Sequence, residues 1–279
     1  MSYKIILDSC GELPKDLKND PRFERVPLTL IVGDIYEKLD DESFDQREFL
    51  DAVASCPTCP KSACPSPERY MQSYQTDADH VYAVALSSKL SGSYNSAVLG
   101  KNLYHEKFGE KDICVVDSKS ASCGQTQILY KIVEWEEAGF SFNEITKKIE
   151  EYVKGLHTYF VLENLETLRK NGRLSAVKAF VASTLNIKPV MGADQGTIIQ
   201  LGQGLGMKKA LAKMVEYAIK DAVDTEKKAA MISHCNNPQA AESVKEQLEE
   251  KAKFARIQIM DTGGISSMYA NDGGVILTI

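Results

Sequence analysis

Short apolar runs alternate with amphipathic stretches through the first half of the chain. Four runs are rich in β-branched residues and apolar at almost every position, which is typical of buried parallel strands. They span residues 4–7, 26–32, 81–86 and 113–116. Helices are predicted over residues 125–138 and from the capping box Ser141 and Glu144 to Gly155. This alternation predicts an α/β fold with a parallel sheet.

Polar residues follow three of the predicted strands directly. They are Asp8-Ser9, Ser87-Ser88 and Asp117-Ser118. Because ligands of parallel α/β sheets bind beyond the carboxyl ends of the strands, these positions are candidates for a binding site.

The second half of the chain is organised differently. Strands are predicted at residues 158–162, 197–201, 229–233, 257–260 and 275–279, and helices at 165–170, 208–222 and from Asn237-Pro238 to about residue 250. The glycines of 202–206 have the spacing G-x-G-x-G late in the chain, which favours a flexible connection over a dinucleotide-binding loop. We therefore predict two α/β domains with a cleft between them. Residues 1–155 form a Rossmann-like domain with a parallel sheet, and residues 156–279 form a domain with a mixed sheet.

Two segments of the first half have the composition of an anion site. Residues 61–68 contain Ser66 before Pro67, and residues 86–94 contain Ser91 and Ser93 around Gly92. A helix start offers unpaired N–H groups and the positive end of the helix dipole, and hydroxyls add further donors, so a carboxylate or phosphate would fit there. Serines at helix starts are common caps, so each segment taken alone favours simple capping.

Composition excludes several classes of protein. The chain has 279 residues, of which 43% are hydrophobic and 26% charged, so it can build a core of its own. A net charge of −6 argues against a nucleic acid or an anionic membrane surface as partner. No apolar run is long enough to span a membrane, and the first residues lack the layout of a signal peptide. We expect a cytoplasmic protein without integral membrane association.

The cysteines and histidines do not predict a metal or cofactor. Cys56, Cys59 and Cys64 lie close together, but zinc would need a fourth ligand, and the four histidines form no ligand pair. Reduced thiols in a loop are the simpler interpretation. No hydrolase elbow or Walker sequence is present, which argues against an enzyme that works alone.

Six segments of the chain, taken in order, resemble motifs of the DegV family. They are Asp8-Ser9 with Glu12-Leu13-Pro14 ("DS…DLP"), Cys64-Pro65-Ser66-Pro67 ("TSQPSP"), Ser87 to Ala97 ("SSxLSGTYxSA"), Val116-Asp117-Ser118 with Gly124 ("VDS…S.G"), Leu165 to Ser175 ("LxxLxKGGRIS") and Lys188-Pro189-Val190 ("KPIL"). The match covers nearly the whole chain. The motifs are short, but their order and spacing together are specific.

The resemblance implies a bacterial fatty-acid-binding protein of two α/β domains. Such proteins bury an acyl chain in a tunnel and present its carboxylate to a separate ATP-dependent fatty-acid kinase, which makes the acyl phosphate. They are therefore not enzymes themselves, and their ligand is a long-chain fatty acid rather than a cofactor.

The resemblance also implies residues for the carboxylate. The family's threonine in the first segment falls on Ser62 and the serine of "LSG" on Ser91, with Ser93 beside it. These are the two segments with the composition of an anion site, so ligand contact becomes the better interpretation for Ser91. The C-terminal family histidine is replaced by Tyr269, which can still donate one hydrogen bond.

A basic loop is the expected contact with the kinase or the phosphoryl group. It contains Lys170 and Arg173 on an otherwise acidic protein. The chain departs from the family at Tyr269, at Ala63 and at Leu205, where an arginine is often found.

An alternative function stays open at this point. The fold is expected to resemble the substrate-binding part of dihydroxyacetone kinases, so the chain could bind or act on a small phosphorylated or keto substrate. That function would need a histidine that attacks a ketone. His234 follows a predicted strand, although a core or loop histidine is the simpler interpretation.

Overall fold

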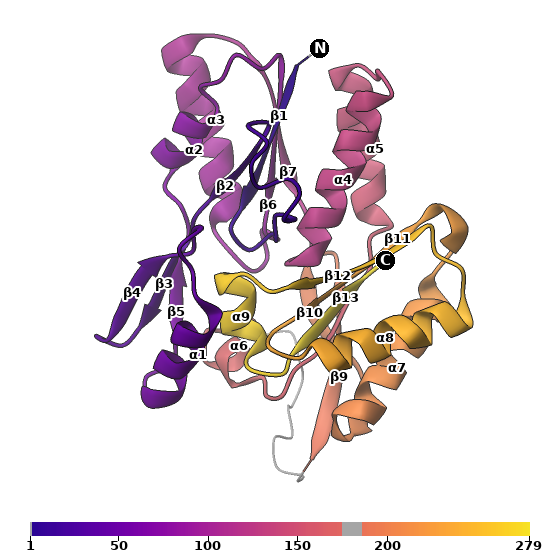
Figure 1. Cartoon of the computed structure of the whole chain (residues 1–279). Coiled ribbons are helices and arrows are strands. Elements are labelled where there is room, and N and C mark those ends of the chain that lie inside the picture. Colours follow the sequence, from indigo (N-terminus) through magenta and orange to yellow (C-terminus); the bar gives the residue numbers. More distant parts are fainter. Residues whose placement is uncertain (1, 175–185) are drawn as a thin grey trace.

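The computed structural model describes residues 2–174 and 186–279 and contains three sheets (Figure 1). The strands are β1 Tyr3–Asp8, β2 Phe23–Val26, β3 Thr29–Val32, β4 Tyr36–Leu39, β5 Lys61–Ala63, β6 His80–Ala85, β7 Asp112–Asp117, β8 Thr158–Val161, β9 Ile187–Asp194, β10 Thr197–Leu205, β11 Ala229–His234, β12 Arg256–Asp261 and β13 Val275–Thr278. The helices are α1 Gln46–Ser55, α2 Pro67–Ser73, α3 Ser93–Phe108, α4 Cys123–Glu137, α5 Phe142–Lys154, α6 Glu166–Lys170, α7 Gly206–Asp221, α8 Pro238–Lys251 and α9 Gly264–Ala270.

The first sheet is parallel, as predicted, with strand order β2-β1-β6-β7. Helices α2 and α3 cover one face and α4 and α5 the other (Figure 1). Successive side chains of β1 point to opposite faces of the sheet. Ile5 packs in the core under α4 and α5, and Ile6 in the core under α2 and α3. The strand order reverses direction between β1 and β6, so a ligand site is expected beyond the ends of these two strands.

The predicted strand over residues 26–32 is wrong as a single element. β2 ends at Val26 in the parallel sheet, and β3 begins at Thr29 in a separate sheet of order β4-β3-β5. Pro27 lies between the two strands and has no N–H to donate, so it cannot continue a ladder of hydrogen bonds. The chain therefore leaves the first sheet here and builds a small antiparallel sheet beside α1.

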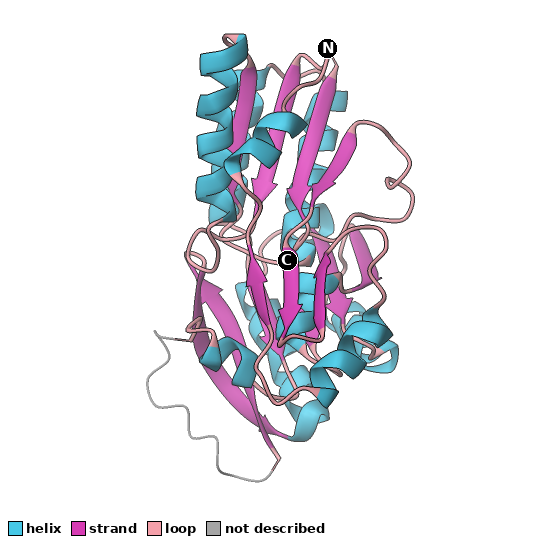
Figure 2. Ribbon diagram, turned by 90° about the vertical axis from the view of Figure 1, so that its left-hand side faces the viewer, coloured by secondary structure: helices cyan, strands magenta, loops and turns pink. Residues whose placement is uncertain are grey.

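The third sheet is mixed, with order β10-β9-β8-β13-β11-β12, which confirms the fold class. Figure 2 shows its strands below those of the parallel sheet. Only β11 and β12 run parallel, and the other neighbours are antiparallel. Helices α7 and α8 bury their apolar stripes on one face. On the other face, Cys123 of α4 lies in one core with strand residues such as Phe160 and Met231. Helix α4 therefore packs against both large sheets.

The predicted flexible connection at residues 202–206 is wrong as well. Residues up to Leu205 belong to β10, which pairs with β9 over its whole length around a bulge at Gln200 and Gly202. A Cβ on Gly204 would lie 2.3 Å from the backbone nitrogen of Ala210. The glycine therefore allows the close approach of strand β10 to helix α7.

The strands of the parallel sheet precede residue 155, and those of the mixed sheet follow it. The division into domains 1–155 and 156–279 stays a prediction. Among the residues that the structure describes, no helix is long and apolar enough to cross a membrane.

Candidate functional site

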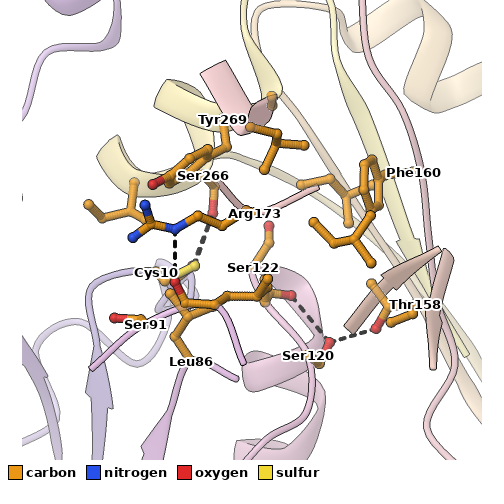
Figure 3. Close-up of a pocket in the computed structure, with 18 of the residues that line it drawn as sticks. Cys10, Leu86, Ser91, Ser120, Ser122, Thr158, Phe160, Arg173, Ser266 and Tyr269 are labelled. Carbon is orange, nitrogen blue, oxygen red and sulfur yellow. Dashed lines mark hydrogen bonds between the residues drawn. The ribbon is translucent and has the colours of Figure 1, made fainter. Parts of the chain in front are cut away.

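A cavity lies where the parallel sheet meets the mixed sheet (Figure 3). Cys10, which follows β1, and Leu86, which follows β6, both line it, so it sits at the point where the strand order reverses. Residues from both halves of the chain contribute to its wall. The empty space measures about 840 Å³ with its open mouth included.

Most of the cavity wall is aliphatic or aromatic. The apolar side chains that line it are Leu28, Leu86, Leu90, Ala121, Phe160, Leu162, Leu168, Ala193, Ile198, Ile265, Ala270 and Ile276. A wall of this kind is suited to hydrocarbon. The wall also contains Cys10, Lys119, Ser120, Ser122, Thr158, Gly196 and Ser266.

Four polar side chains from four different elements gather at one end of the cavity. Ser62 comes from β5, Ser91 from the loop before α3, Arg173 from the loop after α6 and Tyr269 from α9. Figure 3 shows Ser91, Arg173 and Tyr269 on one side of the cavity, and Ser62 acts on Tyr269. Burial raises the pKa of the Tyr269 phenol, against lowering effects of Arg173 and of a hydrogen bond with Ser62, so these three groups act on one another. The end of the cavity therefore offers hydroxyl donors and a cation to an anionic group.

Arg173 is held by backbone oxygens. Its Nε donates to Leu90 O at 3.1 Å and its Nη1 to Asn171 O at 2.5 Å, while its Cζ lies 6.0 Å from the centre of the Tyr269 ring. Within residues 2–174 and 186–279, no carboxylate forms a salt bridge with it. These contacts fix the guanidinium at the wall of the cavity.

The structure separates Arg173 from Lys170, which the sequence placed together. Lys170 is exposed at the end of α6 and is not part of the cavity wall, whereas Arg173 is half-buried in that wall. Ser175, the last residue of the matching motif, lies outside the described residues.

The two serines before α3 have different surroundings. Ser91 lines the cavity, and its hydroxyl accepts a hydrogen bond of 3.2 Å from the backbone nitrogen of Ser93. Ser93 is completely buried, and its hydroxyl lies 3.0 Å behind that of Ser91. Ser91 therefore lies in the cavity wall, whereas Ser93 is buried next to it and is not part of the wall. Direct binding by Ser93 stays a prediction.

Ser66 caps α2, as the sequence predicted, since its hydroxyl accepts from Arg69 N at 3.2 Å.

Asp8 organises the two loops that form the cavity wall at the strand ends. Its carboxylate accepts hydrogen bonds from Leu86 N at 2.7 Å, from the Gln125 side chain at 2.9 Å and from Cys10 N at 3.2 Å. Burial raises the pKa of Asp8 to about 6, against the lowering effect of these bonds. Asp8, the last residue of β1, therefore holds the loops after β1 and β6 in place beside the cavity.

A second buried carboxyl, Glu12, lies behind the wall and was assigned no role from the sequence. Both of its oxygens lie 2.9 Å from the hydroxyl of Ser122, which lines the cavity, and Gly263 N is 3.4 Å away. Burial raises the pKa of Glu12 to about 7, against the lowering effects of hydrogen bonds with Ser266 and Ser122.

Helix α9, which carries Tyr269, is held by the N-terminal half of the chain. Asp40 is completely buried and accepts hydrogen bonds of 2.9 Å from both Gly264 N and Ile265 N at the start of the helix. It also lies 3.3 Å from the guanidinium of Arg25. No pattern in the sequence singles out Asp40, because the helix start that it caps lies more than 220 positions away.

The candidate histidine His234 and the cysteines Cys56, Cys59 and Cys64 do not line the cavity. His234 is buried outside the cavity wall, and its Nδ1 accepts from Asn237 N at 3.2 Å. Among the described residues, no three histidine, cysteine or acidic side chains are grouped to hold a metal ion.

The chain matches a family model over residues 2–278, and the model is described as "Uncharacterised protein, DegV family". Among curated relatives, a DegV domain-containing protein of Streptococcus pyogenes serotype M1 is 34% identical over 99% of both chains. A DegV domain-containing protein of Streptococcus gordonii is 35% identical, and the match covers 99% of this chain and 98% of that protein.

Solved structures with the same fold carry fatty acids. A DegV family protein of Ruminococcus gnavus, refined with vaccenic acid, is 50% identical over 100% of both chains with a TM-score of 0.97. A DegV family protein of Eubacterium eligens loaded with heptadecanoic acid is 28% identical over 99% of both chains, with a TM-score of 0.89. The Fatty Acid Kinase (Fak) B3 protein of Streptococcus pneumoniae, loaded with linoleic acid, is 30% identical with a TM-score of 0.87, and the match covers 100% of this chain and 99% of that one.

Proposed function

We propose that this chain, which belongs to the DegV family, binds one long-chain fatty acid in the cavity and presents its carboxylate to a separate fatty-acid kinase. The proposal assigns the apolar wall to the acyl chain and the cluster of Ser62, Ser91, Arg173 and Tyr269 to the carboxylate. The protein then acts as a carrier and not as a catalyst. A kinase that uses ATP would place this function in the cytoplasm.

One observation carries the proposal: a hydrocarbon-lined cavity ends in hydroxyls and a cation. At about 0.8 kcal/mol per buried CH₂, a chain of roughly fourteen methylenes contributes about 11 kcal/mol before the costs of binding. The polar end therefore contributes more to the orientation of the ligand than to its binding free energy. The fatty acids in the structures of three relatives support a fatty acid as the ligand.

The alternative function, on a small keto substrate, has less support. It would need a nucleophilic histidine at the cavity, and His234 lies outside the cavity wall. A small polar substrate would also leave most of the apolar wall unused.

We expect the protein purified without added lipid to retain about one long-chain fatty acid per chain. The acyl chain is buried along most of its length, so its release is slow compared with purification. Solvent extraction and mass spectrometry measure the lipid. The proposal fails if the extract holds no stoichiometric fatty acid and the delipidated protein also binds no C14 to C18 acid.

We expect Ser91→Ala to weaken fatty-acid binding by about 1–3 kcal/mol, because the carboxylate loses a charge-assisted hydrogen bond. Ser96→Ala in helix α3, which follows Ser91, is the matched control, since Ser96 is half-buried and lies outside the cavity wall. Titration calorimetry compares the two variants. Equal affinities would mean that Ser91 does not contact the carboxylate and only accepts the hydrogen bond from Ser93 N at the start of α3.

We expect Arg173→Ala to weaken binding of the free acid about tenfold or more and to leave binding of its methyl ester almost unchanged. The ester carries no charge, so the comparison isolates the contact between cation and carboxylate. Lys170→Ala is the control, because Lys170 is exposed outside the wall. If both variants bind the acid like the wild type, Arg173 faces the kinase instead, as the sequence predicted.

A further inference from the structure

The tip of the β9–β10 hairpin forms the end of the cavity that lies away from the polar cluster. Figure 3 shows Ser91 and Arg173 on one side and Thr158 on the other. Strand β8 begins at Thr158, and its neighbour β9 runs past it toward Ala193. Ala193 and Gly196 of the hairpin tip both line the cavity. The methyl end of an acyl chain whose carboxylate lies at Ser91 would point toward them.

The hairpin tip is a tight two-residue turn. Asp194 pairs with Thr197, so only Gln195 and Gly196 connect the strands. Both have positive φ angles, 46° and 84°, which is the geometry of the tight hairpin turns that follow the twist of the strands. The turn therefore has little freedom to widen.

The same tip rests directly on loops of the N-terminal half. The Ser87 hydroxyl donates to Gly196 O at 3.0 Å, and Lys119 Nζ donates to Gln195 Oε1 at 2.6 Å. A Cβ on Gly196 would lie 2.4 Å from Ser87 Oγ and 3.2 Å from Lys119 Cα. The tip and these loops are therefore in direct contact at Gln195 and Gly196.

We infer that the β9–β10 tip is the wall at which the acyl chain ends, and that Ala193 and Ile198 set the longest chain the protein binds. These two residues pair across the hairpin and both line the cavity. The inference rests on the proposed function. A chain too long for this space must either lift the tip or draw its carboxylate away from Ser91, and both changes weaken binding.

The test measures the affinities of saturated acids from C12 to C20 for the full chain. Ala193→Leu adds three carbons to the wall, so we expect the longest tightly bound acid to become about two to three carbons shorter. Acids above the new limit should bind about tenfold more weakly or worse, and shorter ones as before. Gln200→Leu is the matched control, because Gln200 is an exposed residue of β10 outside the cavity wall.

Ile198→Ala tests the inference in the opposite direction and does not depend on the folding of the leucine variant. It removes three carbons from the wall, so acids about two to three carbons longer should bind. An Ala193→Leu variant that weakens all lengths equally, or an Ile198→Ala variant with the wild-type limit, overturns the inference and leaves the proposed function standing. A wild-type protein that binds none of the acids overturns both.

Discussion

Replacing Asp40 by alanine is expected to lower the free energy of unfolding by about 3–5 kcal/mol. Asp40 has no exposed surface, and the variant would leave the nearly buried Arg25 without its carboxylate partner. It would also leave the first two N–H groups of α9, at Gly264 and Ile265, without acceptors. Urea denaturation followed by circular dichroism measures the change.

Asp45→Ala is the matched control for this prediction. Asp45 also caps a helix, since it accepts from Glu48 N at 2.8 Å at the start of α1, but it is exposed and has no buried cation beside it. Loss of such a cap costs about 1 kcal/mol. Similar losses in the two variants would mean that Asp40 acts as an ordinary cap and not as a buried link between the halves of the chain.

The Asp40 variant should also bind fatty acid more weakly, under conditions where it remains folded. Helix α9 carries Tyr269 and Ser266, which both line the cavity, so loosening its start displaces both. Unchanged affinity would show that the helix keeps its place without this carboxylate.

The sequence predicted the strands and helices best where local pattern decides them. The apolar runs around β1, β6 and β7 and the capping box before α5 all lie where they were expected. The errors occur where Pro or Gly does not act as the pattern suggests. Pro27 divides one apolar run between two sheets. The glycines of 202–206 do not form a loop but continue β10, where Gly204 allows helix α7 to approach the strand closely.

The candidate site was predictable only in part, for a physical reason. Ser62 and Ser91 were expected from matching motifs and Tyr269 as the residue in place of the family histidine, and all three line the cavity. The apolar wall could not be distinguished from ordinary core, because leucine and isoleucine serve both. Asp40 and Glu12 act through partners that only the folded chain brings near, so local pattern assigned them no role.

The stability of the protein is expected to fall as the pH rises from about 5 to 8, and Glu12 is expected to cause much of the fall. Burial raises the pKa of Glu12 from 4.5 in the unfolded chain to about 7 in the folded protein. Between these values the folded state holds the proton and the unfolded state releases it. Because the folded state then binds more protons, the free energy of unfolding decreases with rising pH. Asp8, with a pKa raised to about 6, adds to the lower part of this range.

The variant Glu12→Gln separates the contribution of Glu12 to this pH dependence from that of the other titratable groups. The glutamine keeps an oxygen that can accept the hydrogen bond from Ser122 but never takes up a buried charge. We expect the variant to be more stable than the wild type at pH 8 by on the order of 2–3 kcal/mol and to differ little at pH 5. Glu249→Gln, on the exposed side of α8, should follow the wild type at every pH. Chemical denaturation across this range gives all three profiles.

Parallel profiles for the wild type and Glu12→Gln would mean that Glu12 is already charged in the folded protein at pH 5. The wall of the cavity would then hold a buried carboxylate throughout this range, stabilised by the hydroxyl of Ser122 and the N–H of Gly263.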